Sequence, residues 1–230
     1  MFTRSGMFAA TGREMQLSAA AMLANLTFLD DRDDEHRAAV DALGRYGKLG
    51  VHGPFTAIFG AERRCVPEVA SVYAELFHRF GYLSVDRMLT ADEWVPFTTL
   101  RDWVGDRDVR RSEVEAVFGP PSLLADKRVL CYAPEDGSGW VFFDCWQERV
   151  ERYEPGHGRF DVLVEDDPLV RDIRVPAGTF DDGLVLTLFG RVLRWGPGWW
   201  IHHPGHDQSP ETGAIAAQLR QLQAGDPSQA

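Results

Sequence analysis

The sequence predicts an α+β protein, in which a helical N-terminal half precedes an antiparallel sheet of about six strands and a short C-terminal helix. The first observation is a change of apolar spacing, from helical before about residue 120 to alternating from residue 127 onward. The second observation is the position of boundary residues. Capping residues and helix-ending residues delimit the helical stretches, and turn-forming residues separate the stretches with alternating apolar residues.

The N-terminal half contains several helical patterns. Thr11 and Glu14 have the spacing of a capping box and predict a helix over 11–29. The acidic linker 30–36 precedes a second helix that ends at Gly47. The glycine-rich segment 47–60 predicts a loop with one short buried element. A wide apolar stripe over 67–80 predicts a third helix packed in the core.

Shorter helices are expected over 90–118. Capping boxes are predicted from Thr90 to Glu93 and from Ser112 to Glu115, and the run from Gly119 to Pro121 ends the helical half. His78, which lies off the apolar stripe of the preceding helix, is expected to face solvent.

The C-terminal half predicts three hairpins and a last helix. The turn PEDGSG separates alternating runs at 127–133 and 139–153, and DDP separates runs at 159–165 and 169–175. The turn GPG separates runs at 183–195 and 198–203. The last helix is expected around 211–223. We therefore predict a helical subdomain over 1–120 and an antiparallel β subdomain over 121–230, packed as one unit.

The stretch SEVEAVFGPPSLL, followed by a strand that ends in Tyr132, resembles the helix, Gly-x-Pro turn and first strand of small α+β modules such as outer-membrane assembly lipoproteins. The lipobox cysteine of such lipoproteins is missing from this chain. The resemblance therefore implies a local helix, turn and strand, and no function.

Composition and motifs exclude several functions. The formal charge of −11 repels nucleic acid and anionic membrane surfaces, so neither is an expected partner. With no signal peptide or apolar span, the expected location is cytoplasmic. Cys65, Cys131 and Cys145 form no C-x-x-C pair and are expected to be buried thiols. The common nucleotide-binding, zinc-protease and serine-hydrolase motifs are missing.

The segment GPGWWIHHPGHD is the most unusual stretch. His202 and His203 would face opposite ways on a strand, so only His203 could converge with His206 and Asp207 on a metal or substrate. Because this spacing matches no established metal motif, we predict no bound metal and no cofactor. Trp199, Trp200 and His202 are candidate binding residues on a surface at the strand end.

The remaining aromatic and acidic candidates lie in predicted strands and turns. Trp140, Trp146 and Trp195 are assigned structural roles, and Trp195 is expected to pair across a hairpin with Trp199. Asp144 shares a strand face with Trp140, so it is expected to be buried with an arginine or backbone partner; the alternative is acid–base catalysis. The Asp pairs at 166–167 and 181–182 are assigned to turns.

Three functions remain open. The leading interpretation is a non-enzymatic acidic protein of the regulatory or immunity type that binds another, basic, protein. The first alternative is an enzyme, such as a metal-dependent hydrolase, with a divergent site at His203, His206 and Asp207. The second is a small-molecule or sugar binder that uses Trp199 and Trp200.

Overall fold

The computed structural model describes residues 11–60, 65–146, 149–156, 158–163 and 166–195. It confirms the α+β class, with helices first and an antiparallel sheet after them. None of the helices in these ranges combines the length and the apolar character that crossing a membrane requires.

The chain divides into two compact units, each assembled from separate segments. Unit 1 comprises Met1–Trp94, Pro121–Phe142 and Arg174–Leu184, and unit 2 comprises Val95–Pro120, Phe143–Ile173 and Val185–Ala230. The unit boundaries fall after residues 94, 120, 142, 173 and 184, and the predicted division into 1–120 and 121–230 stays a prediction.

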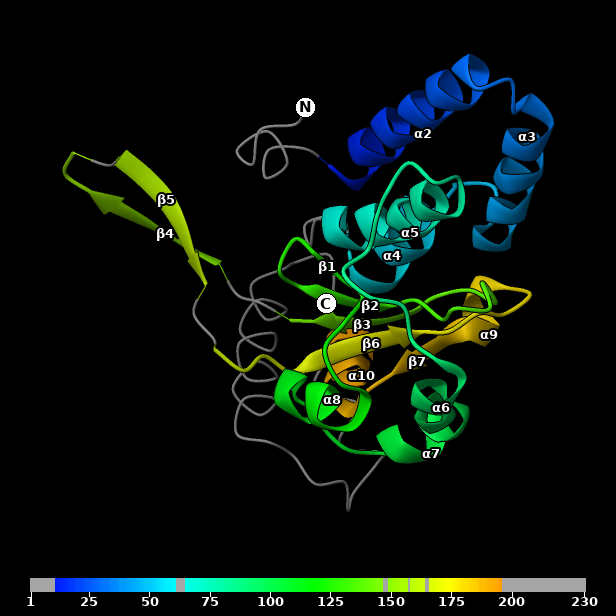
Figure 1. The fold of residues 1–230 in the computed structure, drawn as a ribbon. Coiled ribbons are helices and arrows are strands. Elements are labelled where there is room, and N and C mark those ends of the chain that lie inside the picture. The colour runs from blue at the N-terminus through cyan, green and yellow to red at the C-terminus, as the bar shows by residue number, and fades with distance from the viewer. Residues whose placement is uncertain (1–10, 61–64, 147–148, 157, 164–165, 196–230) are drawn as a thin grey trace. The chain divides into compact units, whose positions relative to one another are not determined.

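Unit 1 contains the longest helices (Figure 1). These are α2 (Gly12–Leu29), α3 (Asp33–Ala42), η1 (Leu43–Tyr46), α4 (His52–Phe59) and α5 (Val66–Arg79), with the shorter α6 (Ala91–Trp94) and α9 (Phe180–Gly183). The predicted capping box of α2 is confirmed, because Thr11 and Glu14 exchange hydrogen bonds of 2.6 and 3.2 Å. Pro67 lies in the first turn of α5 as expected, and the predicted box from Thr90 to Glu93 is also present.

The core of unit 1 forms around the predicted stripe of α5. Val69, Val72 and Leu76 are buried there against residues of α2 and α4. Phe180 from α9 reaches the same cluster and packs against Tyr46 and Phe55, with ring centroids 5.3 and 5.1 Å apart. A second cluster joins Trp140 and Phe142 to Val129 and Cys131.

The short buried element expected within the glycine-rich segment 47–60 is helix α4, which occupies its second half. Phe55 and Phe59 are one turn apart and both buried, so this short helix is held by packing. Gly53 permits the fold here, because a Cβ at this position would lie 2.3 Å from Cβ of Leu49. The density of glycine therefore reflects close approach of the backbone as well as turns.

Unit 2 contains η3 (Val95–Thr99), α7 (Leu100–Val104), α8 (Arg111–Phe118) and α10 (Leu188–Trp195). The predicted capping box from Ser112 to Glu115 is wrong, since the N-cap of α8 is Arg110, two residues before Ser112. Glu113 accepts the backbone N–H of Arg110 at 2.8 Å, and Ser112 instead donates through its N–H and hydroxyl to Asp167 at 2.8 and 2.7 Å.

The main sheet has the strand order β1-β2-β3-β6-β7, and β4 and β5 form a separate two-stranded sheet. Their bounds are β1 (Leu123–Ala125), β2 (Val129–Tyr132), β3 (Val141–Cys145), β4 (Arg149–Glu154), β5 (Gly158–Leu163), β6 (Val170–Arg174) and β7 (Leu184–Leu186). The antiparallel β1–β2 pair aligns Leu124 with Leu130, and β4–β5 aligns Val150 with Val162.

The first predicted hairpin is confirmed in β2 and β3, and the other two are wrong. The run 139–153 divides into β3 and β4, so that β5 pairs with β4 rather than with β6. After β7 the chain forms helix α10 in place of the long strand predicted over 183–195. The partner run at 198–203 and the helix expected at 211–223 lie outside the described residues.

Helix α10 is amphipathic and packed. Leu188, Phe189, Val192 and Leu193 are buried at the spacing of one helix face. Gly190 lies against β6, since a Cβ there would come within 2.0 Å of the carbonyl oxygen of Arg171. The apolar residues of 188–195, which were predicted to form a strand, therefore form one face of a helix, and Gly190 allows this helix to lie close to the backbone of β6.

Candidate functional site

The candidate residues of the segment GPGWWIHHPGHD are not placed by the structure. This group comprises Trp199, Trp200, His202, His203, His206 and Asp207, all beyond the last described residue. The divergence of His202 and His203, the metal-free prediction and the two alternative functions therefore stay predictions. Among the described residues, none of the groups of His, Cys, Asp and Glu is arranged to hold a metal ion.

Asp144 has the arginine partner that the sequence predicted. Its side chain is fully buried in β3 of unit 2, and the guanidinium of Arg171 on β6 donates to it. Arg171 also contacts Asp172 at 3.0 Å. A buried carboxylate on an aromatic strand is thus accounted for by charge pairing, which is the structural interpretation of this residue.

The predictions for three tryptophans and for His78 are partly confirmed and partly wrong. Trp140 is buried and Trp146 packs against Phe189 with centroids 5.9 Å apart, which agrees with structural roles. Trp195 is exposed at the end of α10, so its expected strand position is wrong. His78 is half-buried rather than solvent-facing, because its Nδ1 lies 2.9 Å from the carbonyl oxygen of Leu83 and its ring lies near Trp140.

The two Asp pairs and the three cysteines were also assigned structural roles from the sequence. Asp167 joins the start of α8, as described above, and Asp182 closes the first turn of α9 by donating its N–H to Thr179 at 3.2 Å. The pair at 181–182 therefore lies in a short helix instead of a turn. The three cysteines are buried thiols as predicted.

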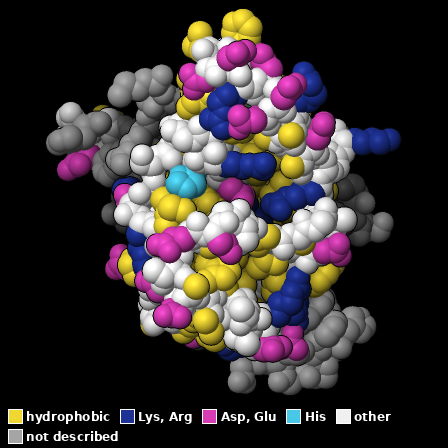
Figure 2. Space-filling model, turned by 45° about the vertical axis from the view of Figure 1, so that its right-hand side comes forward, with side chains coloured by type: hydrophobic (Ala, Val, Ile, Leu, Met, Phe, Trp, Pro, Cys, Tyr) yellow, Lys and Arg dark blue, Asp and Glu magenta, His cyan; other side chains and the backbone are white. Residues whose placement is uncertain are grey.

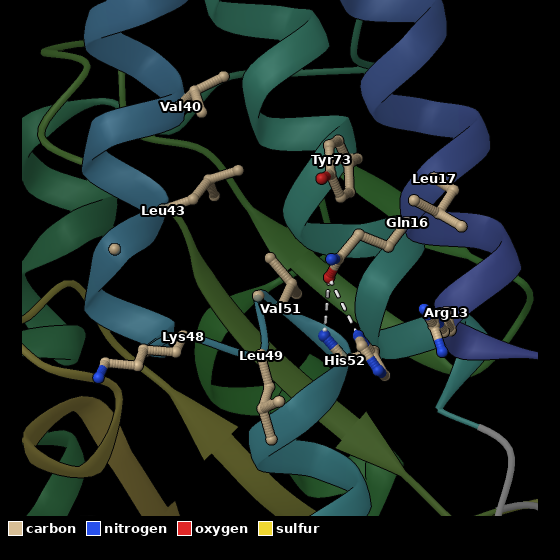
Figure 3. A pocket seen from close by; sticks show the side chains of 13 residues that line it. Arg13, Gln16, Leu17, Val40, Leu43, Lys48, Leu49, Val51, His52 and Tyr73 are labelled. Carbon is tan, nitrogen blue, oxygen red and sulfur yellow. Dashed lines mark hydrogen bonds between the residues drawn. The ribbon is translucent and has the colours of Figure 1, made fainter.

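The structure presents a different candidate site, a pocket of about 570 Å³ in unit 1. It opens between α2 and α3 and reaches the start of α4 and one side chain of α5 (Figure 3). Its lining residues are Arg13, Gln16, Leu17, Val40, Leu43, Gly44, Gly47, Lys48, Leu49, Gly50, Val51, His52 and Tyr73. This volume is within the range of pockets that bind small molecules or single side chains of a partner.

Gln16 and His52 join α2 to the start of α4. The amide oxygen of Gln16 accepts the backbone N–H of His52 at 3.0 Å and lies 3.4 Å from its ring Nδ1, as the dashed lines in Figure 3 show. Burial and the nearby positive charge of Arg13 lower the pKa of His52. His52 is therefore neutral at pH 7, and the neighbouring amide rather than a carboxylate orients its ring.

The pocket is basic although the chain is acidic. Arg13 and Lys48 line it from opposite sides in Figure 3, and none of the lining residues is Asp or Glu. Within the described ranges neither cation has an ion pair or a side-chain hydrogen bond, whereas arginines such as Arg37 and Arg111 pair with nearby carboxylates. The local field of the pocket therefore favours an anion.

Tyr73 supplies the one buried polar side chain of the pocket. The residue is only 5% exposed, and in Figure 3 its hydroxyl points into the space between α2 and α3. That hydroxyl has no hydrogen-bond partner among the described residues. Burial raises the pKa of Tyr73, so the group stays protonated and available as a donor.

Apolar side chains surround these polar groups. Leu17 on α2, Val40 on α3 and Leu49 in the connecting segment are 60%, 46% and 69% exposed, although each lines the pocket. Hydrophobic side chains also protrude at the top of the face shown in Figure 2. Phe28 and Leu29, at the end of α2, are likewise exposed. Exposed leucines and valines from separate segments around one pocket are typical of a recognition surface.

The side chains described in the lining determine what the pocket can do chemically. The ring of His52 has an amide beside it, and the described lining residues include no carboxylate, serine or cysteine. The groups that are present can bind an anion and cover an apolar group.

Sequence reasoning missed this pocket because its residues come from four separate segments. The loop predicted over 47–60 concealed that Val51 and His52 begin a helix beside α2. One signal was visible, since Arg13, Gln16 and Leu17 are spaced to share one face of the helix that their capping box predicts. That face could not be assigned to a site without the fold.

The comparisons add no relative to these observations. No protein-family model, curated protein or solved structure matches the chain significantly.

Proposed function

We propose that this chain is a non-enzymatic protein that binds another protein through the pocket of unit 1. The observation that carries the proposal is that three exposed apolar side chains, Leu17, Val40 and Leu49, line one pocket. Exposed apolar residues scattered singly need no explanation, but a group that rims a cavity is a docking feature. The absence of an activated nucleophile or base in the lining supports binding over catalysis.

The proposal also includes the kind of partner and the type of protein that the sequence predicts. A net charge of −11 supports a basic protein as the partner, because complementary fields speed association and exclude like-charged competitors. The regulatory or immunity type rests on the acidic composition and on the aromatic residues of the C-terminal half.

The test compares two leucines of α2. Leu17 lines the pocket, whereas Leu29, which is 77% exposed, lies at the far end of the helix about 18 Å away. Tagged wild-type protein and the Leu17→Asp and Leu29→Asp variants are purified from the source cell, and the bound proteins are quantified by mass spectrometry. We expect a protein that wild type and Leu29→Asp retain and that Leu17→Asp loses, because a carboxylate would enter an apolar contact.

Salt supplies the second arm of this experiment. A partner attracted mainly by the acidic surface is released as ionic strength rises. Equal retention by Leu17→Asp and wild type, or recovery of the chain alone, contradicts the proposal. The fold of each variant is checked by circular dichroism, because both leucines are largely exposed and their replacement should leave α2 intact.

A further inference from the structure

We infer that the pocket receives a segment of the partner protein that presents a carboxylate beside an apolar side chain. This inference rests on the proposed function and adds the chemistry of the partner at the site. It assigns the carboxylate to Tyr73, Arg13 and Lys48, and the apolar side chain to a contact with the rim residues Leu17, Val40 and Leu49.

First, Tyr73 provides a hydrogen-bond donor to the pocket. Its ring is buried, and its hydroxyl points into the pocket without a partner among the described residues, but it is not one of their fully buried, unpaired polar atoms. The hydroxyl can therefore donate to a ligand that enters the pocket, and a carboxylate oxygen is the strongest acceptor that proteins offer.

The second step is the sign of the charge. The chain has 35 acidic and 24 basic residues, so a lining that contains Arg13 and Lys48 but no carboxylate differs from the chain as a whole. His52 is neutral at pH 7 because burial and Arg13 lower its pKa, which leaves the two cations as the charges that a ligand meets. A basic partner is attracted by the net negative charge of this chain, and one acidic residue on that partner can bind the two cations of the pocket.

The third step is the apolar rim, which distinguishes a peptide segment from a free anion. An inorganic anion or a small carboxylate would contact the polar groups and leave Leu17, Val40 and Leu49 in water. A segment with a leucine or valine beside its acidic residue covers these side chains as well. The free energy of burying apolar surface then adds to that of the ionic contacts.

Two short peptides test the inference directly on the full-length chain. The probes are Ac-Leu-Glu-Leu-NH₂ and its neutral counterpart Ac-Leu-Gln-Leu-NH₂, titrated into ¹⁵N-labelled protein and followed by NMR. We expect saturable shifts of the amide signals of Gln16, Gly50 and His52, with the glutamate peptide at least about tenfold tighter, since it alone makes charge-assisted hydrogen bonds.

Matched variants identify the groups that hold the carboxylate. Arg13→Gln should weaken the glutamate peptide about threefold, as expected for one exposed charge contact, and Tyr73→Phe about fivefold, as expected for one hydrogen bond. Arg79→Gln removes an exposed charge from α5 outside the pocket, and Tyr153→Phe removes an exposed hydroxyl from β4. Both controls should bind like wild type.

The outcomes separate this inference from the proposed function. Equal affinity for the two peptides, unchanged affinity after Arg13→Gln and Tyr73→Phe, or no binding of either peptide overturns the carboxylate assignment. If capture of a partner still depends on Leu17, the proposed function stands without it. If sodium hexanoate binds as tightly as the glutamate peptide and capture does not depend on Leu17, the pocket takes a small carboxylate and both are wrong.

Discussion

His52 is held in a neutral state by its surroundings in unit 1. Partial burial disfavours the charged imidazolium, and the guanidinium of Arg13 repels it, so the pKa of His52 lies below its usual value. A histidine whose pKa is lowered by folding contributes stability that is present above its unfolded-state pKa. That contribution is lost as the pH falls through the folded-state pKa.

Removing the charge of Arg13 tests this account. In Arg13→Gln the pKa of His52 should rise toward its usual value, and the loss of stability below about pH 6.5 should become smaller. NMR titration of the His52 ring protons measures the pKa, and thermal unfolding at several pH values measures the stability. Arg37→Gln, whose charge is already paired with Asp34, should leave the pKa unchanged; an unshifted pKa in Arg13→Gln would show that burial alone acts on His52.

Arg171 neutralises buried carboxylates in unit 2. Asp144 and Asp172 both contact its guanidinium, and all three side chains are buried. Removing the arginine leaves buried carboxylates without this cation, whereas Asp144→Asn leaves the arginine with Asp172. The two kinds of change therefore differ in cost.

We predict that Arg171→Met destabilises the fold by about 3–5 kcal/mol, as found when one partner of a buried ion pair is removed. Asp144→Asn should cost less, about 1–3 kcal/mol. Denaturant unfolding monitored by tryptophan fluorescence measures both. The order of the two variants is the decisive result, and a greater loss in Asp144→Asn would contradict the role given to Arg171.

The end of α2 is built around a residue in an uncommon backbone conformation. Asp31 has a φ of 56°, and hydrogen bonds run from its N–H to Phe28 and from the N–H of Arg32 to Thr27. This pattern is a Schellman motif, in which the left-handed position favours glycine. The carboxylate of Asp31 also lies at the negative end of the helix dipole.

Asp31→Gly should therefore stabilise the protein by about 0.5–1 kcal/mol, in spite of glycine's greater freedom in the unfolded chain. The reason is relief of the left-handed conformation together with the loss of an unfavourable charge. Asp30→Gly is the matched control, because Asp30 has an ordinary φ of −95° and its replacement should destabilise. Thermal unfolding of the two variants decides, and a lower melting temperature for Asp31→Gly would contradict the prediction.

Elements with a local signal were predictable, and elements set by distant contacts were not. The capping box of α2, the stripe of α5 and the β2–β3 turn all lie within short stretches of sequence. Helix α10 was predicted as a strand from the alternating apolar residues of 183–195. Gly190, which lowers helix propensity, lies there because of its close contact with the carbonyl of Arg171, 19 positions earlier in the sequence. The two-residue offset of the capping box at α8 likewise depends on Asp167.

The candidate pocket could be predicted only in part for the same reason. The helix face with Arg13, Gln16 and Leu17 follows from the capping box, but the residues opposite it come from α3, α4 and α5. Asp144 shows the limit for a single residue, since alternation placed it correctly and its partner Arg171 lies on a strand that is not its neighbour in sequence.

At the scale of the whole chain, unit 1 is completed by residues that come late in the sequence. Arg128 binds the buried Glu68 at 3.0 Å. Arg174 bonds to Ser71 at 3.0 Å, and its guanidinium lies over the rings of Phe55 and Phe142 at 5.0 and 4.6 Å. The helical half of the sequence is thus only part of a folded unit.

A fragment of residues 1–120 should accordingly lack a cooperative unfolding transition. It retains the buried Glu68 but lacks Arg128, and it lacks Phe142 and Phe180 from the two core clusters. Circular dichroism should show helix without a sharp thermal transition, and the fragment should bind the dye ANS. A cooperative transition at the melting temperature of the full chain would show that this region folds alone.

The discontinuous make-up of unit 1 sets a delay during synthesis on the ribosome. The segment Met1–Trp94 is translated first, and the last segment ends at Leu184, about 90 residues later. At about 5–20 residues per second this interval lasts roughly 5–18 s. Until β1 and β2 reach it, the apolar face of α5 has only part of its core. We therefore expect this face to stay open to chaperones until the later segments of unit 1 have been made.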